Sequence, residues 1–261
     1  MPPGIGRLKT DMAETTRGRL RVEDGPKRVR VYLGGELVAD TTRVKLVWEV
    51  PYFPQYYIPI DDVRSELLLP SDTVTHSPSR GDASHFTVTT PRARAVDAAW
   101  QYRDSPLTEL RDLVRFDFDA MQWFEEDEEI AVHPRDPATR IDVLDSSRHV
   151  QVVVNGVTVA DTRHPRLLFE TGLPTRYYVP KVDVRMDLLE ATDTETRCPY
   201  KGTAEYWSAR AGDALERDVA WSYPAPLPES QKVAGLVCFY NERVDLVVDG
   251  ELLARPRTKF S

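Results

Sequence analysis

The sequence has few cysteines, no long apolar segment and no run of basic residues. Its two cysteines, Cys198 and Cys238, form no C-x-x-C motif, so we expect neither a disulfide framework nor a metal site, and we predict a reducing cytoplasm. No apolar run approaches the roughly 20 residues of a membrane span, and residues 1–21 lack the apolar core of a secretory signal. The net charge of −8 argues against nucleic acid as a partner. The oligomeric state and any cofactor stay open.

The strongest positive feature is an internal repeat. Apolar residues make up 41% of the 261 residues, enough for real cores, and the motif Val38–Thr41 returns as Val159–Thr162 (161 − 40 = 121). A period of 121 residues exceeds that of any solenoid repeat and indicates tandem duplication of a whole domain. The further pairs at this offset are Glu49 with Glu170, Tyr56–Tyr57 with Tyr177–Tyr178, Asp62–Arg64 with Asp183–Arg185, Gly81 with Gly202, and Trp100 with Trp221.

The composition of the segments and the positions of prolines, glycines and charged residues predict the boundaries of the two copies. The predicted division is a flexible tail at 1–26, a first β repeat at 27–133, a linker at 134–147, a second β repeat at 148–257 and a tail at 258–261. The linker assignment rests on its prolines and charges, although its apolar residues suggest that it packs against one of the units.

Alternating apolar and polar residues predict a mainly β fold. Val29–Leu33 and Val150–Val154 each precede a two-residue turn, Gly34–Gly35 or Asn155–Gly156, which is typical of a β-hairpin. We expect two homologous small antiparallel β domains, barrel-like or two-sheeted, with short helices. Each tyrosine pair should place one ring in the core and one on the opposite face of its strand. Asp62 and Asp183 are expected to cap short helical turns.

A loop bounded by proline and glycine brings two chemically reactive side chains close together in the sequence. Residues 197–202 place a thiol, Cys198, within three residues of an amine, Lys201, and a nearby ammonium lowers the pKa of a thiol. The counterpart loop, residues 76–81, holds Ser77 and Arg80 at those positions. Cys198 and Lys201 are therefore candidates for catalysis. The alternative is a turn whose lysine is solvated and whose cysteine is a small buried apolar residue.

The repeated motifs together resemble the bacterial family called domain of unknown function 427, which also carries a nucleotidyltransferase-like label. The residues that carry the resemblance are Glu170, Tyr177–Pro180, Asp183–Met186, Cys198–Trp207 and Ala220–Pro224. The resemblance covers both copies and implies a compact β-rich domain, present twice, without an established activity. The glycine-serine loop that nucleotide transfer needs is missing from the sequence.

Charged residues that recur inside apolar surroundings indicate a ligand site, in which cations clamp an anion beside aromatic rings. The alternative is a set of structural ion pairs. The candidate ligand-binding residues are Glu170, Tyr177, Tyr178, Arg185 and Lys201 in the second copy and Glu49, Tyr57, Arg64 and Arg80 in the first.

Three functions remain in competition. The favoured one is a tandem module in which both copies bind a small polar or anionic ligand. The second is an enzyme whose Cys/Lys loop acts only in the second copy, and the third is a structural scaffold. Asp117 and Asp119 could hold a divalent cation, but the acidic run that follows them favours a solvated face. No residue is assigned to a metal.

Overall fold

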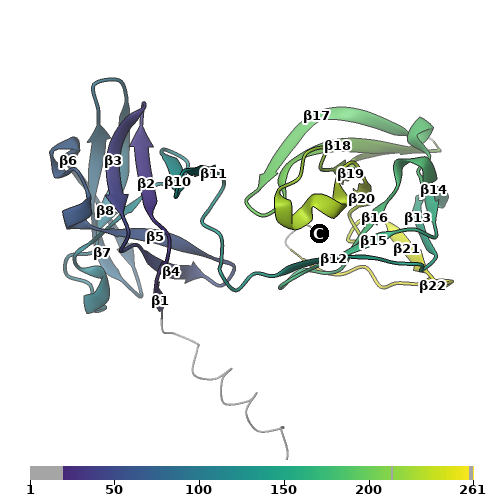
Figure 1. Cartoon of the computed structure of the whole chain (residues 1–261), viewed down its shortest axis with the longest axis horizontal. Coiled ribbons are helices and arrows are strands. Elements are labelled where there is room, and N and C mark those ends of the chain that lie inside the picture. Colours follow the sequence, from purple (N-terminus) through teal and green to yellow (C-terminus); the bar gives the residue numbers. More distant parts are fainter. Residues whose placement is uncertain (1–19, 213, 259–260) are drawn as a thin grey trace, which may run out of the picture. The chain divides into compact units, whose positions relative to one another are not determined.

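The computed structural model describes residues 20–212, 214–258 and 261, and the chain divides into two compact units, Met1–Asp136 and Pro137–Ser261. Figure 1 colours the first unit from purple to teal and the second through green to yellow. Strands account for 56% of the residues and helical turns for 9%, so the mainly β prediction is confirmed. The duplication is equally clear, because both units contain the same succession of strands.

Each unit contains one seven-stranded and one four-stranded antiparallel sheet, which decides for the two-sheeted alternative over the barrel-like one. In the first unit the large sheet runs β1 (Arg21–Asp24), β4 (Lys45–Val50), β5 (Phe53–Pro59), β9 (Leu113–Phe116), β8 (Arg94–Gln101), β7 (Gly81–Thr89) and β6 (Leu68–Ser77). Its small sheet runs β11 (Glu128–Ile130), β10 (Gln122–Glu125), β2 (Val29–Leu33) and β3 (Glu36–Thr41).

The second unit repeats this order. Its large sheet runs β12 (Ile141–Asp145), β15 (Arg166–Glu170), β16 (Arg176–Val179), β20 (Val237–Phe239), β19 (Ala214–Ser222), β18 (Gly202–Ala211) and β17 (Leu189–Cys198). Its small sheet runs β14 (Val157–Thr162), β13 (Val150–Val154), β21 (Asp245–Val248) and β22 (Glu251–Leu252).

The main apolar core of each unit lies between its two sheets, and a second apolar cluster covers the opposite face of the large sheet. We call that opposite face the outer face. Tyr56 belongs to the core and Tyr57 to the outer cluster, and Tyr177 and Tyr178 divide in the same way. The predicted alternation of the tyrosine pairs is thus confirmed, and it follows from the two-residue period of a strand.

Both predicted hairpins form. The two turn residues are Gly34–Gly35 between β2 and β3 and Asn155–Gly156 between β13 and β14, all at positive φ. A Cβ on Gly34 would lie 2.8 Å from the Cβ of Ala93, which explains a glycine there. A Cβ on Gly156 would meet nothing within 4 Å, so only its positive φ favours glycine there, and asparagine accepts the φ of 47° at position 155.

The predicted tail and linker each contain a strand, so those two boundaries are wrong. β1 pairs with β4 inside the predicted tail at 1–26, and β12 pairs with β15 inside the predicted linker at 134–147. Both strands lie at a sheet edge, where one side stays open to water, and this explains their polar composition. The remainder of the first tail, residues 1–19, lies outside the described residues, as do residues 259–260.

The helical elements are short 3-10 turns, and the aspartates do not cap them. They are η1 (Ile60–Asp62), η2 (Ser65–Leu67), η3 (Thr108–Leu110), η4 (Lys181–Asp183), η5 (Met186–Leu188) and η6 (Pro228–Val233). Asp62 and Asp183 end their turns, and each accepts a hydrogen bond from a threonine hydroxyl, of Thr41 and Thr162 respectively. Among the described residues, no helix is long and apolar enough to cross a membrane.

The offset between the copies changes near the end of each unit. Tyr57 pairs with Arg115, whereas Tyr178 pairs with Cys238, so the counterpart of Arg115 is Cys238 (238 − 115 = 123). The segment with η6 is two residues longer than the segment with η3, which accounts for the shift. The constant offset of 121 residues would align Asp117 with Cys238, whereas the strand pairing makes Tyr240 its counterpart (240 − 117 = 123).

Candidate functional site

A row of paired residues crosses the outer face of each large sheet at matched register. We call it the outer row. The outer row of the first unit is Asp24, Lys45, Tyr57, Arg115, Trp100 and His85. The outer row of the second unit is Asp145, Arg166, Tyr178, Cys238, Trp221 and Tyr206. Both rows contain a tyrosine and a tryptophan at the same places. The residue between these two rings is Arg115 in the first row and Cys238 in the second, and the residue after the tryptophan is His85 or Tyr206.

In the first unit, two cations converge on one carboxylate. Nη1 of Arg115 lies 3.3 Å from Oε2 of Glu49, and Nη2 of Arg80 lies 3.8 Å from the same oxygen. The hydroxyl of Tyr57 donates to Oε1 of Glu49 at 2.6 Å. Burial, and then the neighbouring carboxylate, raise the pKa of Tyr57, so this phenol stays protonated. Burial is the largest influence on Arg80 and opposes its charge, but the charge of Glu49 and a hydrogen bond with Tyr102 together outweigh it, so the pKa of Arg80 is raised.

The two arginines of this group carry donors that no described residue accepts. Nε of Arg80 and Nε of Arg115 are both covered from solvent and make no hydrogen bond. The guanidinium of Arg115 lies 4.5 Å from the ring centre of Trp100, whose indole also stacks with His85 at 5.3 Å. Leaving a buried donor without an acceptor costs free energy, so these two Nε atoms are a local cost of the arrangement.

In the second unit the corresponding carboxylate has one cation. Nζ of Lys201 donates to Oε2 of Glu170, and the two side chains are 11% and 8% exposed. Lys201 occupies the turn between β17 and β18, which Gly202 allows by taking a φ of 94°. Two of the candidate ligand-binding residues of the second copy are therefore in direct contact. Because the two opposite charges neutralise each other, the Lys201–Glu170 contact is a structural ion pair and carries no net charge that would attract a ligand.

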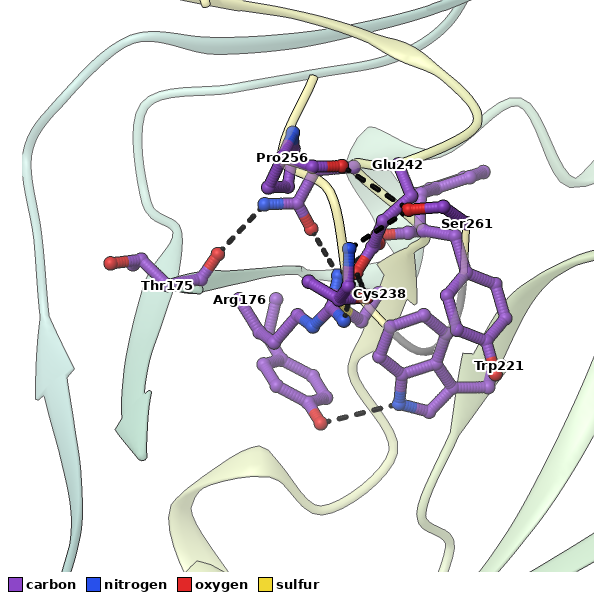
Figure 2. A network of polar contacts seen from close by, with 12 residues as sticks. Thr175, Arg176, Trp221, Cys238, Glu242, Pro256 and Ser261 are labelled. Carbon is purple, nitrogen blue, oxygen red and sulfur yellow. Dashed lines mark hydrogen bonds and ion pairs between the residues drawn. The ribbon is translucent and has the colours of Figure 1, made fainter. Parts of the chain in front are cut away.

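A second ion pair, Arg176 with Glu242, is buried on the same face. Arg176 donates from Nη1 to Oε2 of Glu242 at 2.6 Å and from Nη2 to Oε1 at 2.8 Å, and it also bonds Asn241. Figure 2 shows this network, with the guanidinium of Arg176 beside the indole of Trp221. Burial opposes ionisation of Glu242, but hydrogen bonds from Arg176 and Thr258 outweigh it and lower the pKa of Glu242. Both members of the pair are fully paired and buried.

The two thiols lie in different environments. Cys198 ends β17 and is half-buried, whereas Cys238 is fully buried in the outer row. Burial raises the pKa of Cys238 to about 12, with Arg176 only partly opposing it. Burial above all raises the pKa of Tyr223, and the charge of an ionised Cys198 adds to this rise. In the part of the chain that the structure describes, no base is hydrogen-bonded to the thiol of Cys198, and nucleophilic catalysis by a thiol usually needs one.

Residues 21–127 and 142–250 each match one family model, described as Domain of unknown function (DUF427). The chain belongs to this family. Each unit is one DUF427 domain, and the outer rows lie inside the two matched stretches. No curated protein matches the chain.

The DUF427 domains separate some of the residues that the sequence grouped as ligand-binding. Glu49, Tyr57 and Arg80 meet in the first domain, and Glu170, Tyr178 and Lys201 lie on the same face in the second. Arg64 and Arg185 lie elsewhere, because they are exposed and pair with Glu36 and Asp187. Tyr177 faces the core between the sheets. The inclusion of Arg64, Arg185 and Tyr177 in one site is therefore wrong.

Sequence reasoning missed the arginines that contact the indoles. In the first DUF427 domain this cation is Arg115 on β9, and in the second it is Arg176 on β16. Neither arginine has an arginine at its counterpart, which is Cys238 for Arg115, so a search for repeated residues cannot find them. Strand alternation was the available signal, since each arginine lies two residues from, or directly opposite, an outer-face tyrosine.

Proposed function

We propose that the protein binds small anions and that the first unit holds the reachable site. The observation that carries this proposal is the sharing of one carboxylate, Glu49, by Arg80 and Arg115. Among the described residues, one positive charge is thus left without a counter-charge where the side chains are largely withdrawn from water. A bound anion would supply that charge and would accept charge-assisted hydrogen bonds from the guanidinium groups.

Exposure supports the choice of the first unit. Glu49, Arg80, Trp100 and Arg115 are each half-buried, so that part of every side chain remains open to a ligand. Their covered Nε atoms leave the terminal nitrogens of the guanidinium groups as the ones that a ligand would meet.

The second unit suits a supporting role better than a second binding site. Its cations, Lys201 and Arg176, are buried and each has its own carboxylate, Glu170 or Glu242. An anion would have to displace one of these carboxylates and leave it buried without a partner, which is costly. We therefore propose one anion site per chain in place of the two that the repeat suggested.

Binding is favoured over catalysis at the Cys/Lys loop. The ammonium of Lys201 is held by Glu170, and the phenol of Tyr223 has a raised pKa, so neither activates the thiol. Both cysteines are free thiols, which fits the reducing cytoplasm that we propose as the location of the protein.

The test follows the arginine Nε–H signals of the full chain by NMR during titration with acetate and with inorganic phosphate. We expect the signals of Arg80 and Arg115 to shift and saturate at about millimolar anion, the range open to so small a ligand. Arg115→Gln should abolish saturation, whereas Arg185→Gln, which removes an exposed arginine of the second unit, should not. Shifts that never saturate, or that both variants retain, would remove the proposal.

A further inference from the structure

We infer that the anion bound by the first unit is an organic carboxylate with a single negative charge and an apolar body. This inference rests on the anion site proposed above and narrows its ligand in two independent ways. One concerns the charge of the ligand, and the other concerns the surface around the cations.

The charge balance favours a monoanion. The group holds two guanidinium charges and one carboxylate charge, because the structure pairs Arg80 and Arg115 with Glu49 and with no other carboxylate of the described residues. One added negative charge makes the group neutral. A second one would be placed beside Glu49, whose side chain is only 12% exposed and is weakly screened by water. A carboxylate matches this balance better than a phosphate dianion.

The hydrogen-bonding geometry points in the same direction. Oε2 of Glu49 already lies within 4 Å of both guanidinium groups, at 3.3 Å from Arg115 and 3.8 Å from Arg80. Planar guanidinium groups bind planar carboxylates through two parallel hydrogen bonds, and neither arginine makes such a two-bond contact with Glu49. The looser contacts leave terminal N–H donors to a second carboxylate.

Aromatic rings lie beside both cations, because the guanidinium of Arg115 is 4.5 Å from the ring centre of Trp100 and that of Arg80 is 5.4 Å from the ring centre of Tyr102. Tyr57 and Tyr102 form part of the buried outer cluster, and half-buried apolar side chains pack against that cluster. These half-buried residues are Leu20, Val22, Trp100 and Leu107. An inorganic anion would leave their exposed surface in water, whereas a ligand with an apolar body would cover part of it and gain from the burial. The site therefore suits a carboxylate attached to a hydrocarbon or aromatic group.

The experiment compares four probes on the full chain by calorimetry at pH 7: benzoate, acetate, benzyl alcohol and inorganic phosphate. Benzoate should bind about tenfold more tightly than acetate, because burying roughly half of the ring removes two or more carbon groups from water. Benzyl alcohol should not bind measurably, and phosphate should bind more weakly than benzoate. Arg115→Gln should abolish the binding of benzoate.

A pair of variants isolates the apolar part. Leu107→Ser should remove the preference for benzoate while acetate still binds, and that retained binding shows that the variant is folded. Leu69→Ser, at a position 47% exposed on β6 and outside the cluster, should leave the preference intact. Equal affinities for benzoate and acetate, or tighter binding of phosphate, would overturn this inference and leave anion binding in place. Two results would overturn both this inference and the proposed anion site. One is that no anion binds. The other is that Arg115→Gln binds benzyl alcohol and benzoate with equal affinity.

Discussion

The two units have the same fold but balance charge on their outer faces in different ways. In the first, two arginines share Glu49, and their side chains are 15% and 19% exposed. In the second, each cation has its own carboxylate, and the four side chains are between 0% and 11% exposed. The difference depends mainly on one position of the outer row, which is Arg115 in one unit and Cys238 in the other. After a duplication, the two copies can thus keep the same strands and aromatic residues while their charges diverge. One copy pairs each cation of this face with its own carboxylate, and the other has one cation more than carboxylates.

The largest expected difference concerns the accessibility of the Cys238 thiol to a reagent in solution. Cys198 should react with iodoacetamide more than a thousandfold faster than Cys238 at pH 8, as measured by mass spectrometry of time points. The rise in the pKa of Cys238 from 9 to about 12 alone lowers its thiolate fraction about a thousandfold, and burial adds to this. A Cys198→Ser variant gives the rate of Cys238 alone. Comparable rates in the native chain would mean that the outer face of the second unit is open.

Removing one cation from each unit should affect stability unequally. Arg176→Met leaves Glu242 buried without its partner, since that carboxylate is 0% exposed, and should cost the second unit about 3–5 kcal/mol. Arg115→Met should cost the first unit about 1 kcal/mol or less, because Glu49 keeps Arg80 and the hydroxyl of Tyr57.

Hydrogen exchange during urea unfolding measures both effects, read on β16 and β20 for one unit and on β5 and β9 for the other. Equal losses in the two variants would contradict the difference in charge balance.

The smallest expected effect is a difference in acid sensitivity. The pKa of Glu242 is lower in the folded protein than in the unfolded chain, so its contribution to stability is full above the ordinary glutamate pKa of about 4.3. That contribution is lost as the pH falls through the lowered pKa.

Glu242→Gln should therefore weaken the second unit at pH 7 and flatten the fall in its stability as the pH drops below the ordinary glutamate pKa of about 4.3. Urea unfolding at a series of pH values measures this. A variant with the same steep acid dependence as the native chain would show that another carboxylate is responsible.

Much of the fold was predictable because it depends on local patterns. The hairpins at Gly34–Gly35 and Asn155–Gly156 follow from turn chemistry, and the division of each tyrosine pair follows from strand alternation. β6 and β17 were not predicted, because both are polar edge strands whose side chains are mostly exposed. Without a buried face, such a strand has no apolar alternation to recognise.

The candidate site was predictable only where both copies kept the same type of residue. Glu170 and Lys201 could be paired because Glu49 and Arg80 repeat them at a fixed offset. Arg185 repeats Arg64 equally well, yet both are exposed and bind nearby carboxylates. Repetition identifies residues that each copy needs, but it does not distinguish a binding role from a surface ion pair.

The sequence by itself determined the duplication, the mainly β class and the face on which each tyrosine lies, because these depend on spacing along the chain. Only the tertiary structure decided which charges meet. Arg115 and Glu49 come from strands that are distant in sequence, and strand pairing and the two-residue shift near η6 bring Cys238 to the place of Arg115 in the second unit. Charge balance at a site is a sum over such neighbours, and no local pattern encodes it.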